Sequence, residues 1–351
     1  MSMTDIKKRI ISLRSKNRKL GIDSFFVTNS TNVSYLSGFR GHDSMLFITP
    51  NRSFFLTDSR YIEEAERTVS GFRIKLVKTS VYETLKELAS ASHAKRIGFE
   101  SMDVPYGIAE RLKKFMSKVK FTGFRDVVES IRMVKDASEI TAIKKSVALS
   151  KKVMNKVIEL IAPGVSEKYL AGVIESEFIK YGARSSFSPI VASNKNSSMP
   201  HARPGDTKIP RNGFVMIDMG CNLGGYSSDM TRTVAIGKIN KLFSKIYGIV
   251  KMAQEEAISM VRPGRKIGEL DLAARSIIDK EGYCDCFGHA LGHGIGLDVH
   301  ESPSISRSNT NILMPGMVFT VEPAIYIPGF GGVRVEDMVL VTDKGYEILT
   351  R

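Results

Sequence analysis

The sequence predicts an α/β (α+β) protein of two domains, a mixed α/β domain over residues 1–125 and a second domain over residues 126–351. The 351 residues suffice for two domains of ordinary size, and an apolar fraction of 42% suffices for buried cores. In the first domain, short strand-like runs alternate with amphipathic helical patterns. Near residues 124–135 the pattern changes, because a long helix follows and the later strand-like runs carry acidic residues.

The first domain should begin with a basic amphipathic helix that ends near Leu20. Pro50 and Asn51 separate two apolar runs, which predicts a hairpin turn. Strands are expected at residues 24–28, 45–49, 53–57, 72–77 and 96–100, and helices at residues 60–69, 81–90 and 105–117.

The second domain should open with a long helix. Asp136 is a candidate N-cap for it, and Pro163 with Gly164 follows its expected end near Ile161. Further helices are expected at residues 166–181, 240–261 and 267–281, and strand-like runs close the chain at residues 316–327 and 332–342.

The central stretch of the second domain, residues 215–234, has the pattern of a β-hairpin that carries two aspartates. Asp218 and Asp229 each lie in an apolar or small-residue run broken by glycines. A buried carboxylate is unfavourable unless a cation or hydrogen-bond donors compensate it. A bound metal ion would explain both aspartates, and the alternative is a pair of strand-end residues satisfied by backbone amides.

Histidines and glutamates extend this acidic pattern toward the C-terminus. Residues 288–301 contain three histidines among glycines, which let a backbone approach a site closely. Four carboxylates and one imidazole can hold two divalent cations, and hard oxygen ligands favour manganese, cobalt or another six-coordinate ion. The additional candidates are His289, His293, His300, Glu322 and Glu336.

The net charge of +14 does not indicate nucleic-acid binding. The basic excess lies mainly in the first domain, on the solvated faces of amphipathic helices, and no nucleic-acid motif accompanies it. No apolar run is long enough for a membrane span or a signal peptide. Three cysteines are too few for a disulfide framework, so a reducing, cytoplasmic location is expected.

Asp218, Asp229, His293, Glu322 and Glu336 occur in an order that resembles the ligand set of the pita-bread metallopeptidases. This group contains Xaa-Pro aminopeptidase, prolidase, methionine aminopeptidase and the metal-free creatinase. The resemblance rests on Gly-His-Gly-Ile-Gly at residues 292–296, Val-Glu-Pro at 321–323, Arg-Val-Glu-Asp at 334–337, Ser-Pro-Ile-Val-Ala at 188–192 and Pro-His-Ala-Arg-Pro at 200–204. Tyr-Leu-Ser-Gly-Phe at 35–39 and Asp-Ser-Arg-Tyr at 58–61 resemble the additional domain of the proline-specific members.

The resemblance implies a creatinase-like N-terminal domain and a pita-bread catalytic domain, whose curved, mostly antiparallel sheet is flanked by helices. It also implies two divalent metal ions per subunit, Mn²⁺ or Co²⁺ first and Zn²⁺ or Fe²⁺ as the other options. By analogy, Asp218 would bind one ion, His293 and Glu322 the other, and Asp229 and Glu336 both.

The function implied is a dinuclear-metal exopeptidase that hydrolyses Xaa-Pro bonds by attack of a metal-bridging hydroxide. Its substrate is a peptide with proline at the second position, and a homodimer is expected. In the implied catalytic roles, Glu322 carries the proton, and His201 and His300 donate hydrogen bonds to the oxyanion or handle the proton. In the implied binding roles, His289 is a further substrate-side histidine, or alternatively a core residue, and Arg334 orients the carboxylates.

Several alternatives remain at this stage. A creatinase-like hydrolase lacks the metal ligands, which are all present here, and methionine aminopeptidases usually lack the large N-terminal domain. A non-catalytic pita-bread binding module has lost ligands or substrate histidines. The sequence does not decide between an Xaa-Pro aminopeptidase and an Xaa-Pro dipeptidase. For the proline pocket, the candidates are Phe187, Tyr226 and Tyr326, each with core packing as the alternative.

Overall fold

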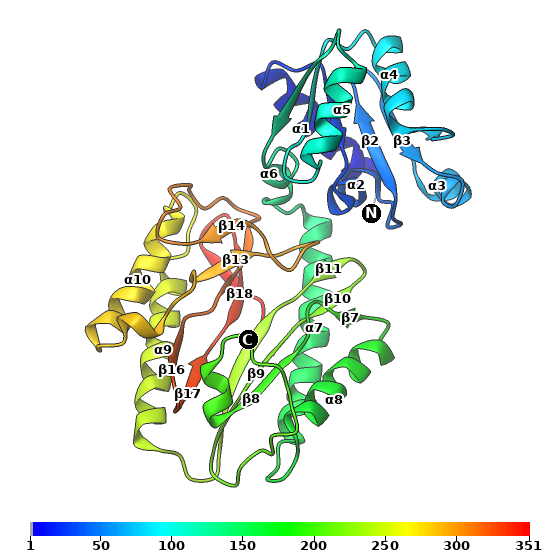
Figure 1. Cartoon of the computed structure of the whole chain (residues 1–351). Helices are drawn as coiled ribbons and strands as arrows, with labels where there is room; N and C mark the ends of the chain where they lie inside the picture. Colours follow the sequence, from blue (N-terminus) through cyan, green and yellow to red (C-terminus); the bar gives the residue numbers. More distant parts are fainter. Residues whose placement is uncertain (1–2) are drawn as a thin grey trace. The chain divides into compact units, whose positions relative to one another are not determined.

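The computed structural model describes residues 3–351, which form two compact units that divide between Arg132 and Met133. The boundary expected at residues 125–126 falls between the last strand and the last helix of the first unit. Figure 1 shows the course of the chain through both units. Residues 1 and 2 of the expected N-terminal segment lie outside the described residues.

The first unit contains a six-stranded sheet in the order β4-β3-β2-β1-β5-β6. β1 pairs antiparallel with β2 and parallel with β5, so the sheet is mixed and the predicted α/β architecture is confirmed. The hairpin predicted across Pro50 and Asn51 is β2–β3. The strands are β1 Ser24–Val27, β2 Ser44–Ile48, β3 Ser53–Thr57, β4 Arg73–Leu76, β5 Arg96–Glu100 and β6 Lys120–Phe124.

Three elements of this unit, helices α2 and α6 and strand β6, were not predicted. α2 has eight residues, too few for a helical period to stand out, and is set by its caps: the Asn29 side chain accepts from the Asn32 amide, and Gly38 ends it at φ 80°. The helices are α1 Met3–Lys19, α2 Ser30–Ser37, α3 Ile62–Thr68, α4 Val81–Ala91, α5 Tyr106–Phe115 and α6 Glu129–Arg132.

The second unit contains two helix pairs, with strands between them. Asp136 forms a capping box with Glu139 at the start of α7, as its position predicted. α7 and α8 pack on the β8–β9–β12 side, and α9 and α10 pack on the opposite side, as Figure 1 shows. The helices are α7 Ala137–Glu159, α8 Glu167–Lys180, α9 Lys241–Ser259 and α10 Ile267–Lys280, with short 3₁₀ turns η1 Asn194–Ser198 and η2 Cys284–Cys286.

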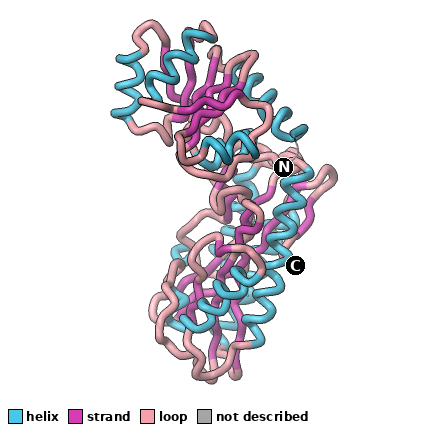
Figure 2. Tube along the Cα trace, turned by 90° about the vertical axis from the view of Figure 1, so that its right-hand side faces the viewer, coloured by secondary structure: helices cyan, strands magenta, loops and turns pink. Residues whose placement is uncertain are grey.

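The described strand pairs of the second unit are all antiparallel, which confirms the expected sheet type. They form the groups β12-β9-β8, β14-β13-β15-β18-β19, β16-β17 and β11-β10-β7. In Figure 2 the strands of this unit lie largely behind or between its helices. The strands are β7 Arg184–Ser185, β8 Ile190–Ser193, β9 Gly213–Met219, β10 Cys221–Leu223, β11 Tyr226–Ser227, β12 Met230–Ile236, β13 Gly292–Gly294, β14 Glu301–Ile305, β15 Val318–Val321, β16 Ala324–Ile327, β17 Gly331–Arg334, β18 Asp337–Val341 and β19 Tyr346–Ile348.

The two closing runs differ from their prediction as continuous strands. The first breaks after β15 at Glu322 and Pro323, and the second breaks after β17 at Val335 and Glu336. β15 then pairs with β18, and β16 pairs with β17. Pro323 has no N–H for a ladder hydrogen bond, and the Glu336 amide donates to Thr231 O, 3.2 Å away in β12. Both glutamates therefore lie where the chain passes from one sheet to another.

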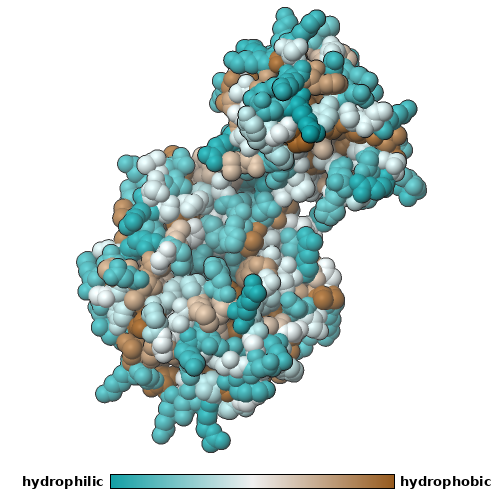
Figure 3. Space-filling view, viewed as in Figure 1, coloured by the Kyte–Doolittle hydropathy of each residue, from teal (hydrophilic) through white to brown (hydrophobic). Residues whose placement is uncertain are grey.

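On the face seen in Figure 3, hydrophobic residues are scattered among hydrophilic ones. None of the helices described between residues 3 and 351 combines the length and hydropathy needed to cross a membrane.

Candidate metal centre and substrate cavity

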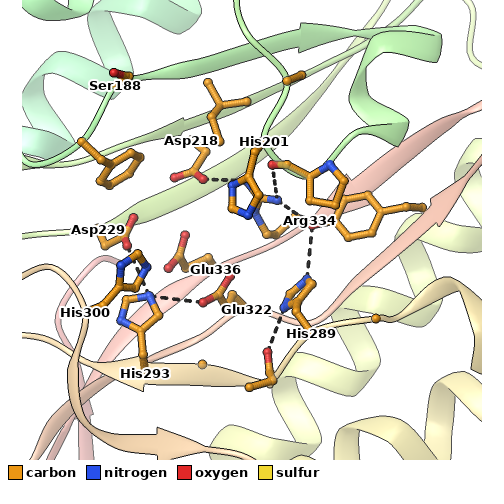
Figure 4. Close-up of a pocket in the computed structure, with 18 of the residues that line it drawn as sticks. Ser188, His201, Asp218, Asp229, His289, His293, His300, Glu322, Arg334 and Glu336 are labelled. Atoms are coloured by element: carbon orange, nitrogen blue, oxygen red, sulfur yellow. Dashed lines mark hydrogen bonds and ion pairs between the residues drawn. The ribbon is translucent and has the colours of Figure 1, made fainter. Parts of the chain in front are cut away.

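A cavity of about 810 Å³ in the second unit is lined by all nine candidate site residues. Figure 4 shows their side chains converging on one region from β9, β13, β17 and the adjoining loops. The nine are His201, Asp218, Asp229, His289, His293, His300, Glu322, Arg334 and Glu336.

The two aspartates come together because β9 and β12 pair directly, with Asp218 opposite Thr231. Gly220 makes this approach possible, since a Cβ there would lie 1.8 Å from Ser228 O. Any side chain at residue 220 would push apart the segments that carry Asp218 and Asp229.

His293 is placed by a similarly close approach in the neighbouring sheet. A Cβ at Gly292 would lie 1.9 Å from Thr320 O, so β13 can lie against β15 only with glycine there. The Glu322 amide donates to Leu291 O at 2.8 Å, which fixes Glu322 beside β13. These contacts bring His293 on β13 and Glu322, which directly follows β15, to one point.

The ligand atoms of Asp229, His293 and Glu336 all lie within 4.8 Å of one another. His293 Nε2 lies 3.6 Å from Asp229 Oδ2 and 3.4 Å from Glu322 Oε1. His293 thus faces two carboxylates at once, as Figure 4 shows. The five predicted ligands converge, with Asp218 on the side of Arg334.

Three buried carboxylate oxygens in this cluster have no hydrogen-bond partner within the described chain: Asp218 Oδ1, Asp229 Oδ1 and Glu336 Oε1. Burial raises the pKa of Asp229 and of Glu336 well above the usual range, and the neighbouring carboxylates reinforce the shift. Burial also raises the pKa of Glu322 to about 7. Unpaired acidic oxygens around one point are unfavourable without cations, so these residues fit divalent metal ions.

His293 suits a metal ligand in its protonation state as well. Burial lowers the pKa of His293 to about 4, and repulsion from His300 adds to the shift. The rings of the two histidines meet edge to face with centroids 4.3 Å apart. A neutral imidazole has a free lone pair for a cation near neutral pH.

Arg334 is buried and bonds to protein through all three of its nitrogens. Nη2 donates to Asp218 Oδ2 at 2.5 Å, and Nε donates to Thr231 Oγ1 at 3.1 Å. Nη1 donates to the Tyr326 hydroxyl at 2.5 Å and to Pro200 O at 3.3 Å. The carboxylate that Arg334 contacts directly is that of Asp218.

His289 also has both ring nitrogens engaged by protein. Nδ1 lies 2.8 Å from Ala290 O, and Nε2 lies 3.3 Å from the Tyr326 hydroxyl. The Ala290 carbonyl can only accept, so His289 Nδ1 carries the proton and donates to it. Nε2 of the neutral ring then accepts from the Tyr326 hydroxyl, which itself accepts from Arg334. Burial lowers the pKa of His289 to about 4. His289 thus lines the cavity as a neutral, hydrogen-bonded ring.

Sequence reasoning missed Asp271 and Arg275, which hold the loop that carries His289. Arg275 on α10 donates to Asp271 Oδ2 at 2.7 Å and to Phe287 O at 2.8 Å, and its guanidinium stacks 4.2 Å from the centroid of the Phe287 ring. The i,i+4 spacing of Asp271 and Arg275 was the available signal, but it is typical of ordinary helix surfaces.

Two of the three candidates for the proline pocket lie at the cavity, and the third does not. Phe187 and Tyr326 line the cavity. Tyr226 instead donates from its hydroxyl to Glu139 Oε1 at 3.1 Å and belongs to a buried cluster with α7.

Two models of known families match the chain. Residues 141–343 match metallopeptidase family M24, and residues 9–134 match the creatinase/prolidase N-terminal domain. Together they include every candidate residue of the cavity.

Individual relatives match over nearly the whole chain. An Xaa-Pro dipeptidase of Pyrococcus horikoshii is 36% identical over 351 residues, covering 99% of this chain and 97% of the relative. The structure of an Xaa-Pro dipeptidase from Bacillus anthracis superposes with a TM-score of 0.95 at 34% identity, over 99% and 98% of the two chains. An X-Pro aminopeptidase structure from Thermotoga maritima gives 0.87 at 36% identity, over 96% and 97%. The chain therefore belongs to metallopeptidase family M24, with a creatinase/prolidase N-terminal domain preceding the metallopeptidase domain.

Proposed function

We propose that this protein is a metal-dependent Xaa-Pro peptidase that removes the residue before proline at the N-terminus of its substrate. The observation that carries the proposal is the convergence of four carboxylates and His293 in one cavity, with buried carboxylate oxygens that lack hydrogen-bond partners among residues 3–351. Relatives named as Xaa-Pro dipeptidases, at 36% and 35% identity, support the substrate class.

The proposed assignment of the metal ligands is the one that the family resemblance implies. Asp218 would hold one divalent cation, His293 and Glu322 the second, and Asp229 and Glu336 both. The oxygen-rich set favours Mn²⁺ or Co²⁺. When bound, such cations polarise a carbonyl group and lower the pKa of a coordinated water.

The remaining steps are assigned to side chains. Glu322 faces the cavity and would accept a proton and deliver it to the leaving proline nitrogen. His300 and His201 also line the cavity and would donate hydrogen bonds to the carbonyl oxygen as negative charge develops there. Arg334 would hold the Asp218 carboxylate in place through their buried ion pair.

Proline at the second position suits the cavity. The amide nitrogen of an Xaa-Pro bond carries no hydrogen, so the site needs no acceptor for one and must instead accommodate a ring. Phe187 and Tyr326 contribute aromatic side chains to the cavity wall.

The test is an assay of metal-stripped protein with added Mn²⁺ or Co²⁺. Xaa-Pro dipeptides and Xaa-Pro tripeptides are compared with Ala-Ala and Met-Ala. Metal-dependent cleavage restricted to the proline substrates supports the proposal. Equal cleavage of the controls overturns the specificity, and no cleavage of any substrate overturns the enzyme assignment.

The homodimer and the cytoplasmic location remain predictions based on the family resemblance and on cysteine usage. Light scattering coupled to size-exclusion chromatography tests the first, and cell fractionation tests the second.

A further inference from the structure

The described lining of the cavity includes two arginines, Arg203 and Arg334, and they differ in what they contact. Arg334 is 3% exposed and bonds to protein through each nitrogen. Its charge is paired with Asp218, so its guanidinium is not available to bind a substrate anion. Any further recognition of an anion by a guanidinium in this cavity depends on Arg203.

Arg203 is exposed and makes no hydrogen bond or ion pair with any residue between 3 and 351. Asp206, the acidic residue of the same loop, pairs instead with Lys168. The guanidinium of Arg203 therefore stands at the cavity with its hydrogen-bonding capacity unused.

The backbone on either side of Arg203 is nevertheless anchored. Pro200 O accepts from Arg334 Nη1 at 3.3 Å, and the Ala202 amide donates to Met199 O at 3.1 Å. On the other side, the Lys168 amide donates to Gly205 O at 3.0 Å. A ligand at Arg203 would order one side chain and leave the loop as it is, which limits the entropic cost of binding.

The other charged side chains of the cavity do not suit an anion. Asp218, Asp229, Glu322 and Glu336 are the proposed metal ligands, and Asp285 adds a further exposed carboxylate to the lining. Arg203 is thus the side chain there whose permanent positive charge is free for substrate.

The possible substrates differ in charge next to the scissile bond. In an Xaa-Pro dipeptide, proline ends in a free carboxylate. In a longer peptide, the same carbon belongs to a neutral amide. A guanidinium distinguishes the two, because it forms charge-assisted, often bidentate, hydrogen bonds only with the carboxylate.

We propose that Arg203 binds the free α-carboxylate of proline and so directs the enzyme toward Xaa-Pro dipeptides. This inference rests on the proposed Xaa-Pro peptidase function. It makes Arg203 a specificity-determining residue, whereas the metal ligands serve dipeptides and longer substrates alike.

The test compares Ala-Pro with Ala-Pro-amide, which differ only in the terminal charge, and adds Ala-Pro-Ala. Arg203→Ala should lower the ratio of kcat/KM for Ala-Pro to that for Ala-Pro-amide by about 10- to 100-fold, mainly through KM for Ala-Pro. Arg203→Lys keeps the positive charge but loses the planar guanidinium that can bind a carboxylate through two N–H groups. Its ratio of the two kcat/KM values should therefore lie between those of wild type and Arg203→Ala.

Arg211→Ala is the matched control, because Arg211 is an exposed arginine of the same segment outside the described cavity lining. Its ratio should equal that of wild type. Melting curves of all variants establish that they fold.

Two kinds of failure are distinguishable. If metal-loaded wild type cleaves none of the three proline substrates, the proposed function itself is wrong. If wild type cleaves them but Arg203→Ala leaves the ratio within twofold, or wild type prefers Ala-Pro-Ala to Ala-Pro, the carboxylate site is wrong.

Discussion

Lys135 and Glu301 form a buried ion pair, with Nζ 2.8 Å from Oε1 and side chains only 1% and 5% exposed. The Lys135 amide donates to Gly316 O at 2.9 Å, so the lysine is also held by its backbone. Glu301 follows His300 directly, and a Cβ at Gly296 would lie 2.6 Å from Glu301 Oε1. The segment before α7 is therefore tied to the turn that carries a cavity histidine.

Replacing Lys135 by Met should destabilise the protein by about 3 to 5 kcal/mol, because the Glu301 carboxylate would stay buried without its cation. Urea unfolding measures the change. The double variant Lys135→Met/Glu301→Gln should recover part of the loss.

Lys144→Met is the matched control. The Lys144–Glu347 pair has the same 2.8 Å separation but side chains 44% and 46% exposed, so its loss should cost less than about 1 kcal/mol. A Lys135→Met variant no less stable than this control would contradict the role assigned to the buried pair.

Asp229→Asn should lower metal affinity, measured by calorimetric titration with Mn²⁺, and reduce kcat/KM on the order of a thousandfold, equivalent to about 4 kcal/mol. Without metal, the same variant should melt above wild type at pH 8, because it removes one of several buried acidic groups that repel each other. Asp206→Asn, on an exposed carboxylate, is the control for both measurements. Undiminished Mn²⁺ binding by Asp229→Asn would refute the ligand role.

Tyr326→Phe should lower kcat/KM by about 10- to 100-fold, because Arg334 Nη1 loses its 2.5 Å hydroxyl partner and His289 Nε2 loses its donor. Tyr226→Phe removes a buried hydroxyl that bonds to Glu139 outside the cavity, so it should alter stability rather than turnover. Equal reductions of kcat/KM by the two changes would show that the Tyr326 hydroxyl does not support turnover through Arg334 and His289.

Glu100 should make the stability of the first unit depend on pH, and it is not one of the proposed metal ligands. It accepts from the Thr28 and Asn29 amides, each at 2.7 Å, yet burial raises its pKa from 4.5 to about 7. A carboxyl whose pKa is higher in the folded state stabilises the fold below the unfolded value, and that contribution is lost as pH rises through the folded value.

The melting temperature of wild type minus that of Glu100→Gln should therefore fall between about pH 4.5 and pH 7. Differential scanning calorimetry at several pH values checks this. A difference that stays constant or rises over this window would contradict the assigned protonation.

The prediction succeeded where the evidence was local. Asp136 located the start of α7, and the helices expected at residues 240–261 and 267–281 are α9 and α10. It failed for α2, which is too short to show a helical period. It also failed for β6, because the sequence Lys-Phe-Thr-Gly-Phe forms a strand through its pairing with β5. It also missed the breaks at Glu322 and Glu336, since a run of apolar residues does not reveal where a chain changes sheets.

The sequence by itself determined the ligand chemistry. Carboxylates and histidines set among glycines and apolar residues are the side chains that bind divalent cations, and buried carboxylates are unfavourable without compensation. Tertiary structure alone decided how the two arginines of the cavity differ. Arg334 is enclosed by Asp218, Thr231 and Tyr326, whereas Arg203 remains free of protein partners within residues 3–351. The physical reason is that the partners of Arg334 come from distant segments, so the engagement of a charge depends on long-range packing that residue type and spacing do not encode.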